Sequence, residues 1–253
     1  MIELIDFSKE YYDFPRKKLA FSVDGISMKI TEGKITGLLG PNGSGKSTII
    51  KAICGQHYPS SGSLFVSDEK GNKIDISQHP QKAANLIGYV PEQSILPDEM
   101  TVFSFLEYAA SLHGLDGEKL KAAIEKTSIE CSLQKVLSKK IKNLSKGYRQ
   151  RVSFAQAMIH NPPNLIFDEP VSGLDPAQII QMRGLIKKLS QSKSVLISTH
   201  ILQEVSLLCS VIYIISEGKL LISGSENAIK EKTGLSTLEE AFFKLTEGKR
   251  RDE

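Results

Sequence analysis

The chain has 253 residues, 40% of them hydrophobic and 24% charged, with a formal net charge of +3. This is ordinary globular composition for one sizeable domain with an attached lobe, and the small charge gives no strong argument for a nucleic-acid partner. The three cysteines lie far apart without metal-binding spacing, which favours a reducing compartment. No signal peptide and no apolar run of the roughly 18–20 residues needed to span a bilayer is present. A role at a membrane would require another chain to provide the span.

The first part of the chain predicts a small antiparallel β-lobe. Residues 2–7 alternate apolar and polar side chains, as in a half-exposed strand. Residues 19–30 predict further antiparallel strands with a turn at Asp24-Gly25. Residues 60–63 predict a turn that leads into the strand Leu64–Val66, and residues 69–72 predict another turn. We expect the lobe to comprise residues of about 1–34 and 60–76.

A glycine-rich loop follows a short apolar strand at 34–39, and residues 49–54 after it predict the first turns of a helix. It fits the pattern G-x-x-x-x-G-K-[ST], which cradles phosphates. Without side chains, glycines allow successive backbone N–H groups to surround an anion, and the start of the helix adds positive field. Lys46 is expected to reach the β- and γ-phosphates, and the Ser47 hydroxyl to bind Mg²⁺. This phosphate loop consists of Gly40, Pro41, Asn42, Gly43, Ser44, Gly45, Lys46, Ser47 and Thr48.

Further apolar runs, short and bounded by turn signals, predict a mostly parallel buried sheet together with residues 35–39. These runs are 86–90, 165–167, 195–198 and 211–215.

The stretch between the predicted strands at 86–90 and 165–167 has a different period. Its apolar residues recur on one helical face from Val102 to Leu112, and Gly114 predicts a stop. Residues 118–127 and 152–159 are also helical in pattern. We predict an all-helical insert at about 96–160 within an α/β core.

Two carboxylates follow the apolar strand at 164–167. Asp168 stands at the carboxyl end of this strand, where parallel sheets place their ligands, and could hold Mg²⁺, usually through its waters. Glu169 is one residue further and is expected to point toward a water that attacks the γ-phosphate. His200 ends a neighbouring strand of the same predicted sheet and can therefore face the γ-phosphate. Taken alone, the acids could be a solvated turn and the histidine a surface residue.

A polar segment, Leu144-Ser145-Lys146-Gly147-Tyr148-Arg149-Gln150-Arg151, precedes the predicted helix at 152–159. Ser145 is a plausible N-cap, and the start of a helix offers free N–H groups to an anion. An ordinary helix cap is the simpler interpretation of this segment by itself.

Together these residues resemble the nucleotide-binding domain of ABC transporters over nearly the whole chain. The phosphate loop, the LSKGYRQR signature segment, the LIFDEP strand, the segment Ser172-Gly173-Leu174-Asp175 and His200 stand in the family's order and spacing. The resemblance implies an α/β fold: a P-loop NTPase core with a mostly parallel sheet, the antiparallel β-lobe and the helical insert. It implies an ABC ATPase domain at 1–225 and a short helical tail at 226–253.

The resemblance also implies ATP and Mg²⁺ as cofactors, and two such domains closing head to tail on two ATP molecules. Lys46 and His200 would stabilise γ-phosphate charge, Glu169 would polarise the attacking water, and Asp175 would link the two sites. The signature residues of one protomer would face the phosphate loop of the other. These residues are Leu144, Ser145, Lys146, Gly147 and Tyr148, of which Lys146 and Tyr148 depart from the broad family pattern.

Two assignments stay open. Tyr11 matches the family's aromatic that stacks on adenine, although a core or surface tyrosine is an equal alternative. After Pro91 most relatives place a glutamine that senses Mg²⁺ and the γ-phosphate, whereas this chain has Glu92 and then Gln93. We favour Glu92 in that place, and either residue could bind the metal.

The likeness is closest to ATPase subunits of the ABC-2 export type. The signature segment and residues 236–242, which resemble the short tail helix of that branch, carry this likeness. The likeness to this branch implies no long regulatory domain of the kind typical of many importer ATPases. The implied partners are separate transmembrane permease subunits and, with ATP, a second copy or a related ATPase subunit. The implied location is cytoplasmic, on the inner face of the cell membrane, with no nucleic acid bound.

The main alternative is a soluble ABC-type ATPase acting on ribosomes or nucleic acid. Such relatives usually carry two cassettes or long coiled coils, and this chain shows neither. A non-catalytic nucleotide-binding regulator is a third possibility, against which intact Glu169 and His200 argue.

Overall fold

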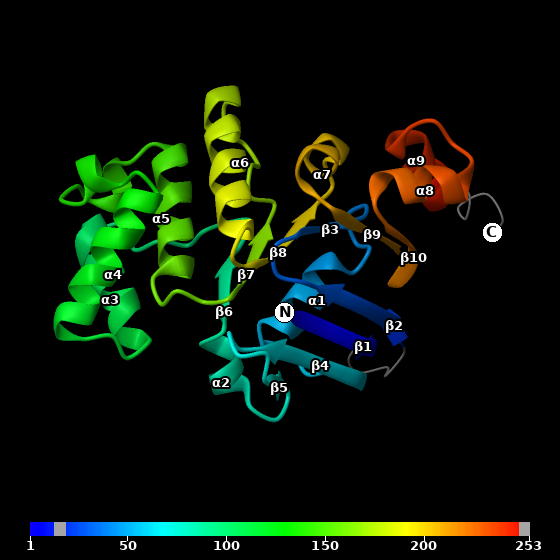
Figure 1. Ribbon diagram of the computed structural model, residues 1–253, viewed down its shortest axis with the longest axis horizontal. Helices are drawn as coiled ribbons and strands as arrows, with labels where there is room; N and C mark the ends of the chain where they lie inside the picture. The colour runs from blue at the N-terminus through cyan, green and yellow to red at the C-terminus, as the bar shows by residue number, and fades with distance from the viewer. Residues whose placement is uncertain (13–18, 248–253) are drawn as a thin grey trace.

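The computed structural model of the protein describes residues 1–12 and 19–247 (Figure 1). Their strands form a four-stranded antiparallel sheet, in the order β2-β1-β4-β5, and a six-stranded sheet, in the order β10-β9-β3-β8-β7-β6. The first sheet contains β1 (Ile2–Tyr12), β2 (Leu19–Ile30), β4 (Ser61–Ser67) and β5 (Lys73–Asp75). The second contains β3 (Ile35–Leu39), β6 (Ile87–Val90), β7 (Asn164–Asp168), β8 (Ser194–Thr199), β9 (Val211–Ser216) and β10 (Lys219–Gly224).

The larger sheet is parallel except at one edge, where β10 pairs with β9 in the antiparallel direction. Its strands β3, β7 and β8 are buried along their whole length, as expected when helices cover both faces of a parallel sheet. The α/β fold with a mostly parallel sheet and a small antiparallel sheet, predicted from the sequence, is therefore confirmed.

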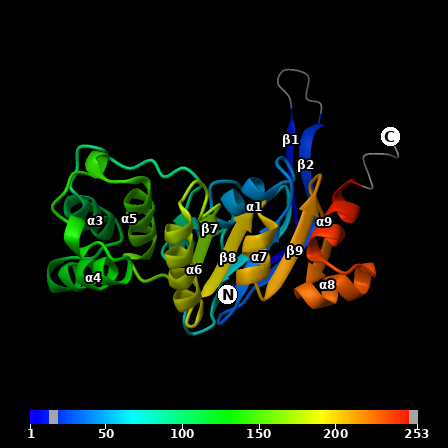
Figure 2. The ribbon, with the colours of Figure 1, turned by 90° about the horizontal axis from the view of Figure 1, so that it is seen from above.

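Alternate side chains of the central strands enter different cores. Leu38, Ile166 and Leu196 pack with helix α1 (Lys46–Ile53), which lies between the two sheets. Phe167 and Ile197 pack on the opposite face with α6 (Pro176–Ser190) and the helices at 102–158. Figure 2 shows α6 and α7 (Leu202–Leu208) on that outer face.

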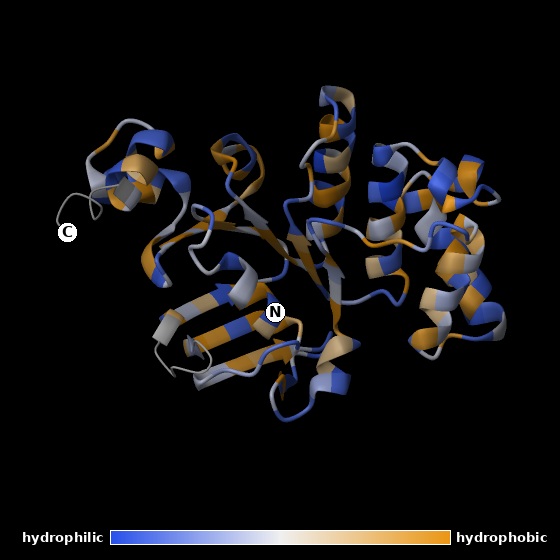
Figure 3. Ribbon diagram, turned by 180° about the vertical axis from the view of Figure 1, so that it is seen from behind, coloured by the Kyte–Doolittle hydropathy of each residue, from blue (hydrophilic) through white to orange (hydrophobic). Residues whose placement is uncertain are grey.

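The helices at 102–158 gather at one end of the molecule (Figures 1 and 3). Thr101 caps the first of them by accepting from the N–H of Ser104. A left-handed Gly114 follows its end, where the sequence predicts a stop. The elements here are α3 (Val102–Leu112), α4 (Gly117–Glu130), the 3₁₀ turns at Gln134–Val136 and Ile141–Asn143, and α5 (Lys146–Met158). A short helix α2 (Pro80–Ala84) precedes β6. Among the described helices, none is long and apolar enough to cross a membrane.

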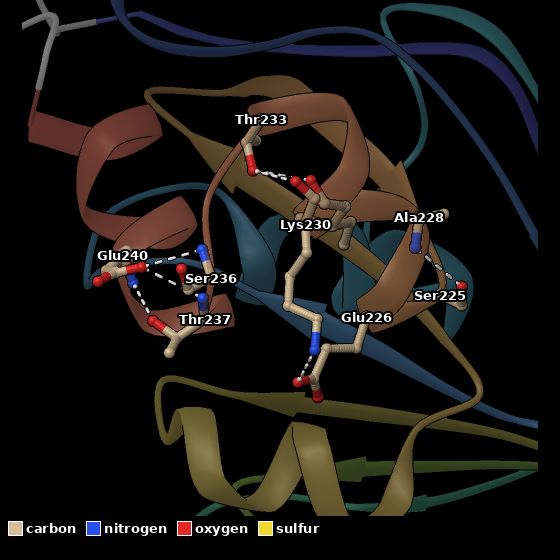
Figure 4. A network of polar contacts seen from close by, with 9 residues as sticks. Ser225, Glu226, Ala228, Lys230, Thr233, Ser236, Thr237 and Glu240 are labelled. Atoms are coloured by element: carbon tan, nitrogen blue, oxygen red, sulfur yellow. Dashed lines mark hydrogen bonds and ion pairs between the residues drawn. The ribbon is translucent and has the colours of Figure 1, made fainter.

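The C-terminal part contains two helices, α8 (Glu226–Thr233) and α9 (Leu238–Glu247), that pack on β9, β10 and α7. A reciprocal capping box starts α9 (Figure 4). The Glu240 carboxylate accepts from the Ser236 and Thr237 N–H groups, and the Glu240 N–H donates to the Thr237 hydroxyl at 3.1 Å.

Two predicted turns are wrong. Residues 19–30 form one strand without a turn at Asp24-Gly25, because a bulge absorbs the left-handed Gly25 (φ 61°). The Asp24 N–H instead donates to the carbonyl of Gly218 at 2.9 Å. The predicted turn at 60–63 is already strand, since Ser61 and Ser63 pair with β1.

Two helix starts and one strand also differ from the prediction. Helix α1 starts at Lys46, inside the phosphate loop, and not at Ile49. Helix α5 starts at Lys146, not at Val152, so the signature segment supplies its first turns. The edge strand β10 was not predicted, because its half-buried pattern gives little period-2 signal.

Candidate functional site

The topology brings three chain segments to one edge of the larger sheet. Strands β3, β8 and β7 are adjacent and parallel, so their carboxyl ends lie side by side. The phosphate loop follows Leu39, the two carboxylates end β7, and His200 follows β8. An open parallel sheet binds its ligands at this edge.

Contacts from β9 and the turn after it hold the phosphate loop in place. A Cβ added at Gly40 would lie 2.3 Å from the carbonyl oxygen of Ile215, so no side chain fits there. The Gly218 N–H, in the turn between β9 and β10, donates to the carbonyl of Ser44 at 3.0 Å. Gly43 and Gly45 both have positive φ, of 79° and 108°, which glycine adopts without strain. The loop is therefore a fixed curve of backbone rather than a mobile turn.

Lys46 reaches back into this curve. Its side chain is only 8% exposed, and its Nζ donates to the carbonyls of Gly40 at 2.6 Å and Pro41 at 3.0 Å. Burial lowers the pKa of Lys46, while the charges of Glu169, Asp168 and Glu92, in that order, act against this shift. An ammonium group thus lies inside the loop, close to three carboxylates.

A hollow of about 250 Å³ opens beside the loop, and we refer to it as the phosphate hollow. It gathers most of the residues predicted to bind ATP and the metal. Its lining consists of Phe21, the loop residues 42–48, Glu92, Asp168 and Glu169.

This lining fits a phosphate chain with a divalent cation. The loop offers backbone N–H groups and the Lys46 ammonium to phosphate oxygens. The buried Ser44 hydroxyl has no hydrogen-bond partner in the described part of the chain. Ser47, Asp168 and Glu92 are hard oxygen donors, as Mg²⁺ prefers. Within residues 1–12 and 19–247, no group of three or more acidic, histidine or cysteine side chains could hold a metal alone. Oxygens of a bound phosphate would complete such a site.

The two carboxylates of the LIFDEP strand have different surroundings. Burial raises the pKa of Asp168, and repulsion by Glu169 and Glu92 adds to this shift. Glu169 leaves the strand in a left-handed conformation (φ 47°), and its N–H still donates to the carbonyl of Ser198 at 2.9 Å. In a continued strand the two acids would point to opposite faces of the sheet, whereas after this change of backbone direction both line the phosphate hollow.

Donors from the end of β8 hold the Glu169 side chain. Its Oε1 accepts from the His200 N–H at 3.0 Å and lies 2.6 Å from the His200 Nδ1. Its Oε2 accepts from the Thr199 hydroxyl at 3.0 Å. The His200 side chain is 53% exposed and is not part of the lining of the phosphate hollow.

Glu92 and Gln93 take different places. Glu92 lines the phosphate hollow, whereas Gln93 lines only a neighbouring hollow of about 370 Å³, which also contains Glu92. Lys146 and Ser172 belong to that second hollow as well.

The signature segment lies away from the phosphate hollow of its own chain. Ser145 is the N-cap of α5 and accepts from the Tyr148 N–H at 3.5 Å. A Cβ added at Gly147 would lie 2.5 Å from the Gln178 side chain on α6, so this end of α5 packs closely on the start of α6. Asp175 caps α6, accepting from the Gln178 N–H at 2.9 Å.

The other residues of the signature segment and of the segment 172–175 lie close to these two helix starts. The Lys146 side chain covers Gly173, where an added Cβ would lie 1.9 Å from Nζ. Leu144, Tyr148 and Leu174 are half-buried against the core shared with the helices at 102–158. None of these residues lines the phosphate hollow.

Tyr11 lies on β1 and packs against the rings of Phe21 and His57, with centroid distances of 6.4 Å and 5.9 Å. It does not line the phosphate hollow, whereas Phe21 does. Sequence reasoning missed both Phe21 and Thr199. Thr199 adjoins His200 in the chain, which was the one available signal, and Phe21 had none beyond its strand.

Comparisons with known proteins agree with this geometry. The family model described as "ABC transporter" matches residues 23–172. The ABC transporter ATP-binding protein NatA of Bacillus subtilis is 33% identical over 251 residues, covering 98% of this chain and 99% of NatA.

Solved structures give the same result. One, titled as the ATP binding subunit of an ABC transporter, has a TM-score of 0.83 and 28% identity, covering 97% of this chain and 99% of its own. The dimeric structure of MJ0796, a bacterial ABC transporter cassette, has a TM-score of 0.76 and 25% identity, covering 89% and 98%.

Proposed function

The chain belongs to the ABC transporter family as an ATP-binding subunit, and we propose that it hydrolyses ATP to power separate membrane subunits of an ABC-2 type exporter. One observation carries the catalytic part of this proposal. The phosphate hollow places Glu169 beside Lys46, with Glu169 held by Thr199 and His200. These are the parts that phosphoryl transfer to water requires.

Each residue has a defined task in this proposal. The loop N–H groups and the Lys46 ammonium would hold phosphate oxygens and offset their charge. Glu169 would accept a proton from the attacking water, and His200 would approach the γ-phosphate from the end of β8. Ser47, Asp168 and Glu92 would hold Mg²⁺, which when bound neutralises charge on the phosphates.

The signature segment would act on a second chain. Since it lies apart from the phosphate hollow of its own chain, it can complete the site of a head-to-tail partner. Ser145 and Gly147 would present the N-terminal N–H groups of α5 to the partner's ATP, and Asp175 would link the two sites. The dimeric structure of MJ0796 supports this arrangement. The partner would be a second copy or a related ATPase subunit.

We assign contact with the membrane subunits to the helical insert at 96–160 and the loop before it. These parts expose large apolar side chains, among them Ile95 (97% exposed) and Leu112 (67%). Such contact would place the protein in the cytoplasm on the inner face of the membrane. The signature sequence LSKGYRQR and the helices of the C-terminal tail support the exporter subtype.

Replacement of Glu169 by Gln tests the catalytic part. Gln keeps the shape of the side chain and removes the general base, so turnover should fall by about 10²–10⁴-fold. Binding of ATP, measured by fluorescence titration, should be retained, and ATP should stabilise a dimer in gel filtration. The matched control, Lys46→Ala, should weaken ATP binding itself. Turnover near the wild-type level in Glu169→Gln would contradict the assignment.

A further inference from the structure

We propose that Thr199 is a positioning residue for hydrolysis, whose hydroxyl fixes Glu169 and leaves one acceptor site for the attacking water. The inference rests on the general-base role proposed for Glu169.

The Thr199 hydroxyl has a defined direction. Thr199 is the last residue of β8 and is only 1% exposed. Its Oγ1 accepts from the Ile201 N–H at 3.1 Å and lies 3.0 Å from Glu169 Oε2. An ionised carboxylate can only accept, so the hydroxyl proton points at Glu169. The backbone N–H at the start of α7 therefore orients the hydroxyl, and the hydroxyl orients the acid.

The bond from Thr199 limits the acceptor positions that the Glu169 carboxylate leaves for water. A carboxylate offers about four lone-pair positions, roughly two on each oxygen. With a proton on the His200 Nδ1, the backbone and ring N–H groups of His200 occupy both positions on Oε1. Thr199 occupies one position on Oε2. The remaining position on Oε2 is the one available to a water in the phosphate hollow, which Glu169 lines.

Glu169 depends on this bond because its own backbone does not fix the side chain. It has left β7 in a left-handed conformation and is attached to β8 through its N–H. Without the hydroxyl, Oε2 would lose its only donor among the described residues. The carboxylate would then be held at Oε1 alone, by His200, and its plane could turn. Rotation would change the lone pair presented to the water.

The test compares Thr199→Val, which removes the hydroxyl at similar volume, with Thr199→Ser, which keeps it. A hydrogen bond to a charged group contributes about 1.5–3 kcal/mol, so Thr199→Val should lower kcat by roughly 10- to 100-fold. KM for ATP should stay within about threefold, because the residue does not line the phosphate hollow. Thr199→Ser should restore kcat to within about threefold of the wild type.

The double variant Thr199→Val/Glu169→Gln separates positioning from packing. If Thr199 acts through Glu169, the double variant should turn over ATP no more slowly than Glu169→Gln alone. Wild-type kcat in Thr199→Val, or equal losses in the Val and Ser variants, would overturn the inference while leaving Glu169 as the base. Normal turnover in Glu169→Gln would instead overturn the proposed function.

Discussion

Glu92 stands where most members of the family have a glutamine. It adds a third carboxylate to the phosphate hollow. Like Glu169 and Asp168, its charge raises the pKa of Lys46 against the larger effect of burial. An amide in that place could donate as well as accept, whereas an ionised carboxylate can only accept. The added negative charge opposes a triphosphate unless a cation is present. Glu92 should therefore make nucleotide binding more dependent on metal.

Replacement of Glu92 by Gln should raise the affinity for ATP in the absence of Mg²⁺ and leave turnover within a few-fold of the wild type. Isothermal titration with ATP, with Mg²⁺ present and with the metal chelated, measures this difference directly. Gln93→Ala is the matched control, because Gln93 lies outside the phosphate hollow. A changed metal response in Gln93→Ala alone would mean that our assignment is displaced by one residue.

Local sequence predicts some of these side chains better than others. The residues of the phosphate loop, Asp168 and Glu169 could be named because each stands in a fixed order next to an apolar strand. The choice between Glu92 and Gln93 depended on how a loop without regular structure turns, which spacing does not determine. Thr199 and Phe21 gain their places from contacts between distant strands, so no local pattern announces them.

Among the elements, the helices at 102–158 are attached to the core by an unusual contact. His113 follows α3 and His160 follows α5, and their rings stack with a centroid distance of 3.6 Å. His113 Nδ1 lies 3.1 Å from Oδ1 of Asn85, just before β6. Burial, followed by repulsion from His113, lowers the pKa of His160 from its usual 6.5 to about 4. The ring therefore stays neutral in the folded protein over a pH range where an unfolded chain would protonate it.

Acid should accordingly destabilise this junction. A base with a lowered folded pKa contributes stability above its unfolded pKa, and this stability is lost as pH falls from 6.5 toward 4. The loss should reach roughly 2–3 kcal/mol at pH 4.5. His160→Phe keeps the stacking and removes the charge, so it should lose less stability than the wild type between pH 7 and pH 4.5. Urea unfolding at both pH values measures the difference, and parallel losses would exclude His160 as the cause.

Boundaries of elements were the weakest part of the sequence prediction. Apolar periodicity identified the strands of the larger sheet except β10, and helices within 102–158. It did not identify the bulge in β2, because Asp24-Gly25 is also the commonest composition of a turn. It placed the start of α5 too late, because the first turns of that helix, Lys146 to Arg151, are mostly polar and carry no apolar periodicity.

At the scale of the whole molecule, one chain carries both halves of a site without joining them. Lys46 lies in the phosphate hollow, while Ser145 caps a helix outside it. A closed symmetric dimer would therefore contain two sites, each built from both chains.

Complementation between two inactive variants tests that arrangement. Ser145→Arg places bulk and charge at the start of α5, and Lys46→Ala disables the phosphate loop, so each variant alone should lack turnover. Half of the dimers in an equal mixture would be mixed, each with one intact site, so activity should recover to at most about a quarter of the wild-type level. ATP binding to Ser145→Arg checks that it is folded. A mixture as inactive as its components would contradict a site shared between chains.

The strand order also constrains how the protein can be made. Both neighbours of β3 in the sheet, β8 and β9, come from the last quarter of the chain. On a ribosome that adds about 5–20 residues per second, β3 would emerge roughly 10–35 s before β9 is complete. During that interval the five residues of β3, all buried in the folded protein, have no partner strands. The phosphate loop also lacks the hydrogen bond from the Gly218 N–H to the Ser44 carbonyl. The nascent chain should therefore be unable to bind nucleotide until β9 and Gly218 have been synthesised, and it should need protection by chaperones until then.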